Sequence, residues 1–287
     1  MKSKIFAIAA AAALTLTVAA PAVTAAPAVD GRKTCEAYIA DIKVDGTIDE
    51  AWEYAPIISV DTVKENASAW FGDSSKKAGV DYATLNCRVL WDGDSTLFML
   101  FEVQDKTISL VGANPWEQDS IEYFLQTENS TDPAAAKTQV RYLADGSSEL
   151  AGDSTAAYKE TDGGFIYEIS CDISAVGGAG EYFGIDFQYN DDAEGNGVRN
   201  VCLGWSDSQD KASSDCSVYG QCLLSDVTVD DLIAEAEAAA AAEAEAEASA
   251  SSAQTSDLSI IGAMAALVAG AGAGFLRPRA QATHTIE

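Results

Sequence analysis

The sequence predicts an all-β domain, an antiparallel β-sandwich, over residues 30–229. Short segments in this region alternate apolar and polar residues, and clusters of Gly, Asp, Asn and Ser separate them. A length of roughly 200 residues is typical of one domain that buries a core without cross-links. We expect strands at residues 84–91, 96–103, 120–126, 138–143, 165–171, 182–189, 198–205 and 221–224.

The first two of these strands are expected to form a hairpin. The segment between them reads Asp92-Gly93-Asp94-Ser95, and these are residues that favour tight turns. Inside the domain, only the neighbourhood of Asp49-Glu50-Ala51-Trp52 favours a helix, of about one turn.

Residues 1–25 have the pattern of a secretory signal peptide. Lys2 and Lys4 precede an apolar run, and Val23-Thr24-Ala25 supplies the small residues that a signal peptidase requires. The alternative is an N-terminal membrane anchor, for which the apolar run is short. We therefore expect an exported protein.

The end of the chain predicts attachment to the cell surface. Residues 230–257 are rich in Ala and Glu and lack an apolar stripe, which is typical of a solvated spacer. Residues 258–276 are apolar and uncharged, and as a helix they nearly cross a bilayer. Arg277 and Arg279 begin a short tail, 277–287, and would keep it cytoplasmic.

We expect residues 258–276 to be a transmembrane helix or a wall-sorting segment of the Gram-positive kind. The preceding Ala253-Gln254-Thr255-Ser256-Asp257 resembles a wall-sorting signal but departs from its usual L-P-x-T-G pattern. The alternative is an apolar low-complexity tail. Membrane and cell wall are thus both expected partners of this end of the chain.

Charge and histidine content exclude several functions. The formal net charge is −28, so a nucleic-acid partner, which requires clustered Lys and Arg, is not expected. The single histidine, His284, lies beyond the apolar segment, so the domain has no histidine for a Ser-His-Asp mechanism or a metal site. Neutral sugars and cations such as calcium remain compatible with the composition.

Six cysteines are present, and an exported chain permits disulfides. Their spacing does not choose among the possible pairings, and thiols in an anaerobic habitat are equally compatible. The cysteines are Cys35, Cys87, Cys171, Cys202, Cys216 and Cys222.

Among the five tryptophans, Trp116 has the surroundings of a binding residue. It lies in Asn114-Pro115-Trp116-Glu117-Gln118-Asp119, a polar segment that leads into a predicted strand. An exposed ring among polar groups suits the flat C–H face of a sugar. A buried loop tryptophan is the alternative. Trp52 and Trp91 are expected in the core, and Trp70 among polar residues is expected to be more exposed.

The domain resembles carbohydrate-binding module family 9, known from xylanases and related secreted proteins. Six segments carry the resemblance, in the family's order and at compatible spacing. They are Val44-Asp45-Gly46-Thr47-Ile48-Asp49-Glu50-Ala51-Trp52, Arg88-Val89-Leu90-Trp91-Asp92, Asn114 to Glu122, Gly164-Phe165-Ile166-Tyr167-Glu168, Gly184 to Asp191, and Trp205-Ser206-Asp207. The resemblance implies a β-sandwich that binds sugars without catalysis and holds calcium structurally.

The resemblance also implies roles for particular residues. Trp116 would stack on a sugar ring, and Glu122, Arg141 and Gln188 would hydrogen-bond to its hydroxyls; Asp210 completes the set. Alternation would place Glu122, Arg141 and Gln188 on one sheet face. The alternative is a Glu122–Arg141 ion pair that binds no ligand.

One departure from the family pattern concerns the second aromatic face of the site. Cellulose-binding members carry another Trp eight residues after that of W-S-D, where this chain has Ser213, so Trp205 is expected to be structural. Losing one ring removes about 1–2 kcal/mol of stacking, or roughly tenfold in affinity. Tyr219 or Trp70 could compensate. Sugar binding is therefore a firmer prediction than a cellulose-type clamp.

Acidic turns are the candidate calcium ligands, because calcium requires several oxygen atoms. They contain Asp92 and Asp94 in one turn and Asp191 and Asp192 in another, and ordinary polar turns are the alternative. Two other functions stay open: a glycoside hydrolase or hydrolase-associated protein acting through some pair of carboxylates, and a structural surface protein with a degenerate sugar site.

Overall fold

The computed structural model describes residues 31–72 and 81–261, with side chains up to residue 246. The predicted signal peptide, the tail 277–287 and most of the apolar segment 258–276 lie outside the described residues.

The described part contains thirteen strands, three short 3-10 helices and one α-helix. The strands are β1 (Thr34–Ile39), β2 (Ile58–Val60), β3 (Thr62–Val63), β4 (Thr84–Trp91), β5 (Thr96–Gln104), β6 (Ser120–Gln126), β7 (Thr138–Leu143), β8 (Ser148–Leu150), β9 (Thr155–Thr161), β10 (Gly164–Asp172), β11 (Tyr182–Asp191), β12 (Val201–Gly204) and β13 (Gly220–Thr228). The 3-10 helices are η1 (Glu50–Glu53), η2 (Pro115–Glu117) and η3 (Cys216–Val218), and the α-helix is α1 (Val229–Ile261).

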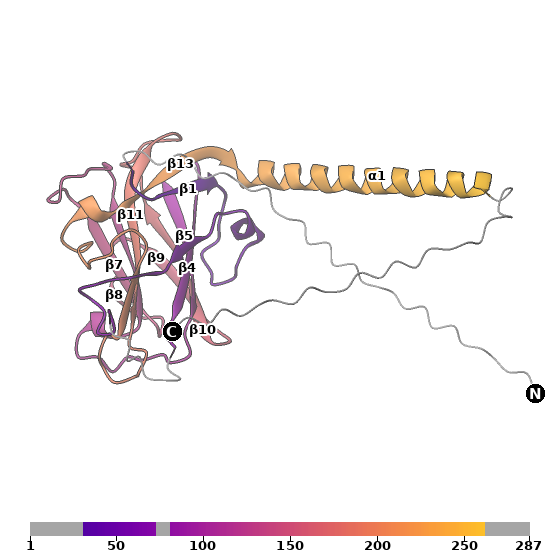
Figure 1. The fold of residues 1–287 in the computed structure, drawn as a ribbon. Coiled ribbons are helices and arrows are strands. Elements are labelled where there is room, and N and C mark those ends of the chain that lie inside the picture. Colours follow the sequence, from indigo (N-terminus) through magenta and orange to yellow (C-terminus); the bar gives the residue numbers. More distant parts are fainter. Residues whose placement is uncertain (1–30, 73–80, 262–287) are drawn as a thin grey trace, which may run out of the picture. The chain divides into compact units, whose positions relative to one another are not determined.

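The strands form one continuous sheet that folds back on itself (Figure 1). Its order is β8-β7-β6-β11-β13-β1-β4-β5-β10-β9. Aromatic rings from strands that are not hydrogen-bonded neighbours meet across the interior: Phe101 of β5 with Phe187 of β11, at 5.8 Å between centroids, and Tyr142 of β7 with Tyr167 of β10, at 5.2 Å. The two halves of the sheet therefore face one another, which confirms the predicted β-sandwich.

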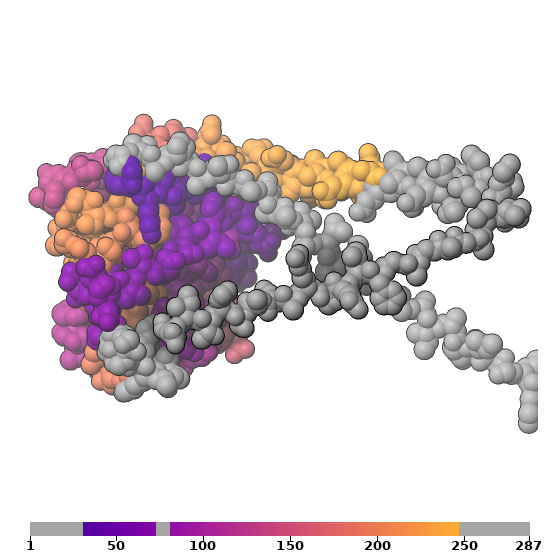
Figure 2. Space-filling view, viewed as in Figure 1, coloured from indigo at the N-terminus to yellow at the C-terminus, as the bar shows by residue number. Residues whose placement is uncertain are grey.

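The sandwich is not antiparallel throughout. Strand β1 runs parallel to both of its neighbours, β13 and β4, at the point where the two halves of the sheet join. Parallel neighbours require long connections, and β13 and β4 are both far from β1 in the sequence. In Figure 2 the early residues (indigo and purple) and late residues of the domain (orange) accordingly lie side by side on the visible face.

Most predicted strands are confirmed. Strands β4, β6 and β7 have the predicted limits, and β5, β10 and β11 extend one or two residues beyond theirs. The segment predicted at 198–205 is shorter, as β12, and the one at 221–224 is longer, as β13. Strands β1, β2, β3, β8 and β9 were not predicted. Strands β2, β3 and β8 have only two or three residues each, and neither β9 nor β1 shows a regular alternation of buried and exposed residues.

The buried carboxylate of Glu168, on β10, explains two of the sequence motifs. It accepts hydrogen bonds from the backbone N–H groups of Asp45 (3.1 Å) and Gly46 (2.8 Å) and from Nε1 of Trp52 (3.0 Å). Trp52 and Trp91 are both buried, as predicted. These hydrogen bonds fasten the segment Val44–Trp52 to strand β10. Both motifs, Val44–Trp52 and Gly164–Glu168, therefore stabilise the fold.

The predicted spacer is helical in the structure. Helix α1 begins directly after β13 and runs through residues 230–257 into the predicted apolar segment. Its first turns do have a buried face, unlike the prediction, because Val229 and Leu232 pack in a cluster with Trp52 and Leu90. Among the described residues, no helix is both long and apolar enough to cross a membrane.

All six cysteines are free and buried. Cys35 of β1 and Cys222 of β13 lie opposite one another in the sheet. Burial raises the pKa of the Cys202 thiol to about 12, so this side chain is a neutral core group at physiological pH.

Candidate functional site

Trp116 is held at the surface by the polar residues around it. Asn114 and Glu117 form a capping box around η2: the Asn114 backbone N–H (2.8 Å) and Nδ2 (3.0 Å) both donate to Oε2 of Glu117. Pro115 occupies the first turn, where its fixed φ is favourable. The Trp116 side chain between them is 45% exposed. The prediction of an exposed ring is confirmed.

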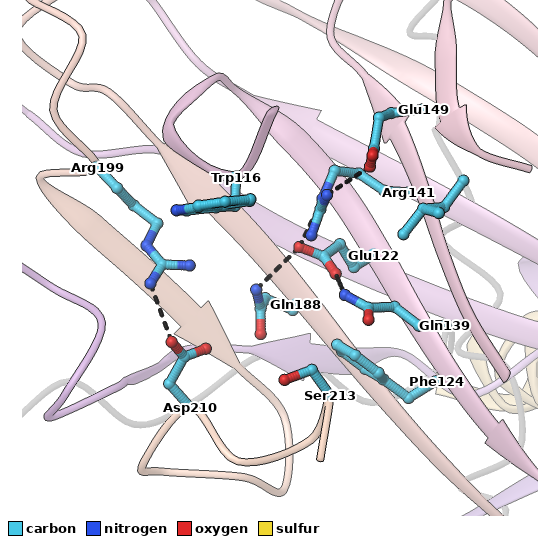
Figure 3. A pocket seen from close by; sticks show the side chains of 11 residues that line it. Trp116, Glu122, Phe124, Gln139, Arg141, Glu149, Gln188, Arg199, Asp210 and Ser213 are labelled. Atoms are coloured by element: carbon cyan, nitrogen blue, oxygen red, sulfur yellow. Dashed lines mark hydrogen bonds and ion pairs between the residues drawn. The ribbon is translucent and has the colours of Figure 1, made fainter. Parts of the chain in front are cut away.

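Trp116 borders a pocket of about 380 Å³, the main pocket, shown in Figure 3. This volume is at the lower end of the range for small-molecule sites. All of the predicted sugar-binding residues line it. The lining consists of Trp116, Glu122, Phe124, Gln139, Arg141, Glu149, Leu150, Gln188, Arg199, Asp210 and Ser213.

Three adjacent strands supply the floor of the main pocket. Glu122 of β6 pairs in register with Arg141 of β7 on one side and with Gln188 of β11 on the other. Directly opposed residues of neighbouring strands point to the same face. The predicted grouping of Glu122, Arg141 and Gln188 is therefore confirmed.

Glu122 is the centre of a hydrogen-bond network. Its Oε1 accepts from Arg141 Nε (3.0 Å), Gln188 Nε2 (3.1 Å) and Asn190 Nδ2 (2.7 Å), and its Oε2 accepts from Gln139 Nε2 (2.6 Å). The side chain is 1% exposed. The ion pair with Arg141 exists, as the alternative prediction states, but it forms part of the pocket floor.

Within the described part of the chain, hydrogen bonds engage two of the three guanidinium nitrogens of Arg141. Nε donates to Glu122, and Nη1 donates to Oε2 of Glu149 at 2.6 Å. These two charge-assisted bonds hold the guanidinium plane in place. Nη2 is then available to a sugar hydroxyl.

Gln188 is engaged by the protein on both sides of its amide. Nε2 donates to Glu122 (3.1 Å) and Asn190 (2.9 Å), and Oε1 accepts from Nζ of Lys64 at 2.5 Å. Direct bonding of Gln188 to a sugar stays a prediction. In the structure the amide links the buried charge of Lys64 to that of Glu122.

Lys64 is a buried residue of the site that the sequence did not reveal. Its ammonium also pairs with Oδ2 of Asp207 at 3.0 Å. Burial opposes the charge on Lys64, but its acidic neighbours, which include Asp186 and Asp207, outweigh this effect and raise the pKa of its ammonium. Burial raises the pKa of Asp186 to about 6 against the opposing attraction of Lys64. A lysine after two short strands carries no sequence signal of burial.

Arg199 is a second residue that the sequence missed. It donates through Nε to the Ala67 carbonyl (3.0 Å), through Nη1 to Asn190 Oδ1 (3.0 Å) and through Nη2 to Asp210 Oδ2 (2.9 Å). Asp210 has a φ of +62°, a left-handed conformation that Asp tolerates better than most residues. The predicted residue Asp210 thus reaches the main pocket as the ion-pair partner of Arg199.

Sequence comparison identifies the family to which this arrangement corresponds. The family described as carbohydrate family 9 binding domain-like matches residues 44–227. The chain belongs to this family. Its segment 44–227 includes every residue that lines the main pocket.

Two of the curated relatives that this chain matches are xylanases. Endo-1,4-beta-xylanase C of Paenibacillus barcinonensis is 30% identical over 189 residues, 63% of this chain and 16% of the xylanase. Endo-1,4-beta-xylanase A of Thermotoga neapolitana is 30% identical over 185 residues, 62% of this chain and 16% of that protein. The chain thus spans about a sixth of the length of these two relatives.

Two solved structures share the fold. One is a family 9 carbohydrate-binding module from Caldicellulosiruptor kristjanssonii in complex with glucose, with a TM-score of 0.59, 19% sequence identity, and coverage of 68% of this chain and 97% of that one. The other is a module of the same family and organism in complex with cellotriose, with a TM-score of 0.58, 19% identity, and coverage of 68% and 95%.

Two aromatic residues line the main pocket, and of these Trp116 is exposed whereas Phe124 is 1% exposed. Ser213, where a second Trp was expected in cellulose-binding members, is exposed and lies across the pocket from Trp116 (Figure 3). Tyr219 does not compensate, because it is 1% exposed and its hydroxyl donates to the Ala212 carbonyl. Trp70 is half-buried against the core and does not line the pocket. Trp205 is buried, as expected for a structural residue.

A candidate metal centre lies at the ends of strands β5, β6 and β11. Carboxylate oxygens of Asp105, Asp119 and Asp191 lie within 4.8 Å of one another, and all three residues are buried. Oδ1 of Asp191 has no hydrogen-bond partner among the described residues. Burial and the neighbouring acids raise the pKa of Asp119 to about 8 and that of Asp191 to about 7. A divalent cation fits this set, since it would supply the missing positive charge.

The predicted calcium residues behave differently from one another. Asp191 belongs to the cluster, and Asp192 lies beside it, bonded to Ser109 through Oδ2 at 2.7 Å. Oδ1 of Asp92 accepts backbone N–H groups from Asp94, Ser95 and Thr96, each at 2.9 Å. Asp92 and Asp94 therefore form an ordinary polar turn. Asp105 and Asp119 were not predicted, because they come from separate strand ends.

Proposed function

We propose that this chain binds the terminal residue of a neutral glycan in the main pocket, without catalysis. The observation that carries the proposal is the half-exposed ring of Trp116 beside a rigid, charged floor. The apolar face of a sugar ring would stack on the indole, and its hydroxyls would bond to Nη2 of Arg141 and to Oε2 of Glu122, which accepts a bond from Gln139.

The charges of the main pocket favour a neutral sugar. Three carboxylates, those of Glu122, Glu149 and Asp210, line it together with two guanidiniums, those of Arg141 and Arg199. The whole chain is also strongly acidic, at −28. An acidic sugar would meet net repulsion here. The ligands of the two similar structures, glucose and cellotriose, are neutral and so support this choice.

Hydrolysis is a weaker candidate for the main pocket. A glycosidase requires one carboxylic acid that holds a proton. Both oxygens of Glu122 accept hydrogen bonds, and Asp210 is paired with Arg199. Both carboxylates are therefore already engaged by cationic or amide donors of the protein itself.

The experiment is a calorimetric titration of the protein with glucose and with cello-, xylo- and manno-oligosaccharides. We expect binding of at least one neutral series, and Trp116→Ala to weaken it about tenfold or more through loss of stacking. Ile57→Ala, at a side chain 57% exposed and outside the main pocket, is the matched control. Absence of binding to all three series, or equal binding by Trp116→Ala, would contradict the proposal.

A second part of the proposal is that calcium occupies the cluster of Asp105, Asp119 and Asp191. Asp119 lies three residues after Trp116, and its carboxylate accepts the backbone N–H groups of Ser109 (2.6 Å) and Asp192 (2.7 Å). A cation bound there would stabilise the loop that carries Trp116. The ion would be structural, since the cluster does not line the main pocket.

The sequence also supports display of this domain at the cell surface. The expected signal peptide would export the chain, and the expected apolar segment 258–276 would anchor it in the membrane or link it to the wall. Protease treatment of intact cells tests this: a displayed domain is digested while a cytoplasmic marker survives. Survival of the domain would count against display.

A further inference from the structure

Three of the six cysteines lie in one row across three neighbouring strands. Cys35 of β1 is paired in register with Cys222 of β13, the strand beside it in the sheet (Figure 1). On the other side of β1, Tyr38 is paired with Leu90 of β4. The same register, continued back along both strands, places Cys87 beside Cys35. All three side chains are buried in the same apolar cluster, so the row lies on the inner face of the sheet.

Cys222 is the better placed of these two neighbours to bond to Cys35. The pairing of β1 with β13 includes Cys35 itself, whereas its pairing with β4 covers Tyr38 and Ile39. Neighbouring strands lie about 4.8 Å apart, and disulfides span about 4.4–6.8 Å between Cα atoms. Cys35 and Cys222 therefore have the spacing that a disulfide requires.

The two thiols also interact with one another directly. Burial, and after it a hydrogen bond with the Cys35 thiol, raises the pKa of the Cys222 thiol well above its usual value. The two sulfur atoms are thus within reach of each other without a rearrangement of either strand.

We propose that Cys35 and Cys222 form a disulfide in the exported protein. The predicted signal peptide would bring the chain to a compartment in which disulfides persist. The bond would join the first and last of the described strands, and β13 continues directly into α1, which leads to the predicted anchor. The strand that carries the tether would thus be linked covalently to the start of the domain.

The bond forms by exchange with an external disulfide, such as glutathione disulfide or a dithiol oxidoreductase in its disulfide form. Cys35, at 5% exposure against 0% for Cys222, loses its proton and attacks one sulfur of the oxidant, whose S–S bond breaks and releases a thiolate. Cys222 then loses its proton and attacks the Cys35 sulfur of this mixed disulfide, which releases the second thiolate. The oxidant takes up two electrons, and the two protons pass to its released thiolates.

Burial determines when this exchange takes place. The raised pKa of the Cys222 thiol disfavours its attacking form in the folded domain, so the exchange occurs while β1 docks onto β13. The core then shields the finished bond from reductants.

The test is peptide mapping of the full protein after refolding in a mixture of reduced and oxidised glutathione. The refolded protein is unfolded and alkylated without reductant. We expect alkylation to leave two of the six cysteines unmodified, and mapping to recover Cys35 linked to Cys222. Alkylation of all six would overturn the proposal, and so would any other partner of Cys35, Cys87 included.

Thermal unfolding with and without reductant gives a second measurement. Reduction of a disulfide that closes nearly the whole domain should lower the melting temperature by about 4–20 °C. Cys222→Ser should abolish this response, whereas Cys87→Ser, the control at an equally buried position of the same row, should retain it. Equal responses of the two variants would contradict the pairing.

The mapping uses the native protein, so its result stands even where a variant does not fold. Failure of the proposal would also leave the proposed function intact, because neither Cys35 nor Cys222 lines the main pocket. Sugar affinity is accordingly expected to be the same in the oxidised and reduced protein.

Discussion

The ammonium of Lys64 donates to the side-chain oxygen of Gln188 over 2.5 Å, at a place where both residues are buried. This bond determines the orientation of the Gln188 amide. Since Oε1 faces Lys64, Nε2 must face Glu122 and Asn190. A buried lysine beneath the pocket thus orients the floor on which a sugar would lie.

Replacing this lysine is expected to affect both stability and binding. In Lys64→Met, Asp207 and Gln188 lose their buried cation, which should cost about 3–5 kcal/mol in the free energy of unfolding. The Gln188 amide is then free to rotate, so sugar affinity should fall as well. Urea unfolding and calorimetric titration measure the two effects. Lys43→Met is the control, because Lys43 is 82% exposed, and an equal effect of both substitutions would contradict the role of Lys64.

The three hydrogen bonds to the Glu168 carboxylate are expected to stabilise the fold without affecting sugar binding. In Glu168→Gln the amide offers one oxygen to three donors, so at least one buried bond is lost, at about 1.5–3 kcal/mol. The melting temperature should fall by about 3–12 °C for a domain of this size. Glu160→Gln, on exposed strand β9, should leave it unchanged. A change in sugar affinity of the folded Glu168→Gln protein would show that these hydrogen bonds also affect the main pocket.

Restoring the second ring is expected to strengthen binding. Ser213 is exposed, so Ser213→Trp places an indole across the main pocket from Trp116 without displacing core residues. Stacking on the second sugar face should add about 1–2 kcal/mol, or roughly tenfold in affinity. Ser214→Trp, at the next exposed position and outside the pocket lining, is the matched control. No gain from Ser213→Trp in calorimetric titration would mean that the sugar lies elsewhere in the pocket.

Calcium is expected to stabilise the protein most at mildly alkaline pH. Burial raises the pKa of Asp119 to about 8 and that of Asp191 to about 7, so without metal the folded state retains protons that the unfolded state releases. The stability of the metal-free protein should therefore fall as pH rises from about 4 through 8. Calcium would replace these protons, and a concentration of 100 Kd adds about 2.7 kcal/mol, or about 5–11 °C in melting temperature.

The measurement is thermal unfolding in EDTA and in calcium at pH 5 and pH 8. Asp191→Asn should reduce the calcium effect at pH 8, because it removes a ligand from the cluster. Asp94→Asn, in the predicted turn that forms no cluster, serves as the control. A calcium shift that is equal in both variants and in the native protein would place the ion elsewhere.

The pattern of alternation located eight of the thirteen described strands of the sandwich but not the environment of their polar faces. All seven residues of β6 are buried, including Ser120, Glu122 and Gln126. Alternation reports that two faces of a strand differ in polarity, and it does not report whether the polar face meets solvent or a buried network. The parallel placement of β1 was also invisible, because it depends on strands far away in the sequence.

The sequence by itself determined the sandwich and the exposure of Trp116, through local motifs and the two-residue period of strands. The resemblance to family 9 singled out Glu122, Arg141 and Gln188, and the same period is compatible with their common face. Only the tertiary structure decided the roles of Lys64, Arg199 and the cluster of Asp105, Asp119 and Asp191. These residues come from separate segments that share no spacing. Their functions arise from burial and from the charges that folding brings beside them, and neither quantity is encoded at a single position.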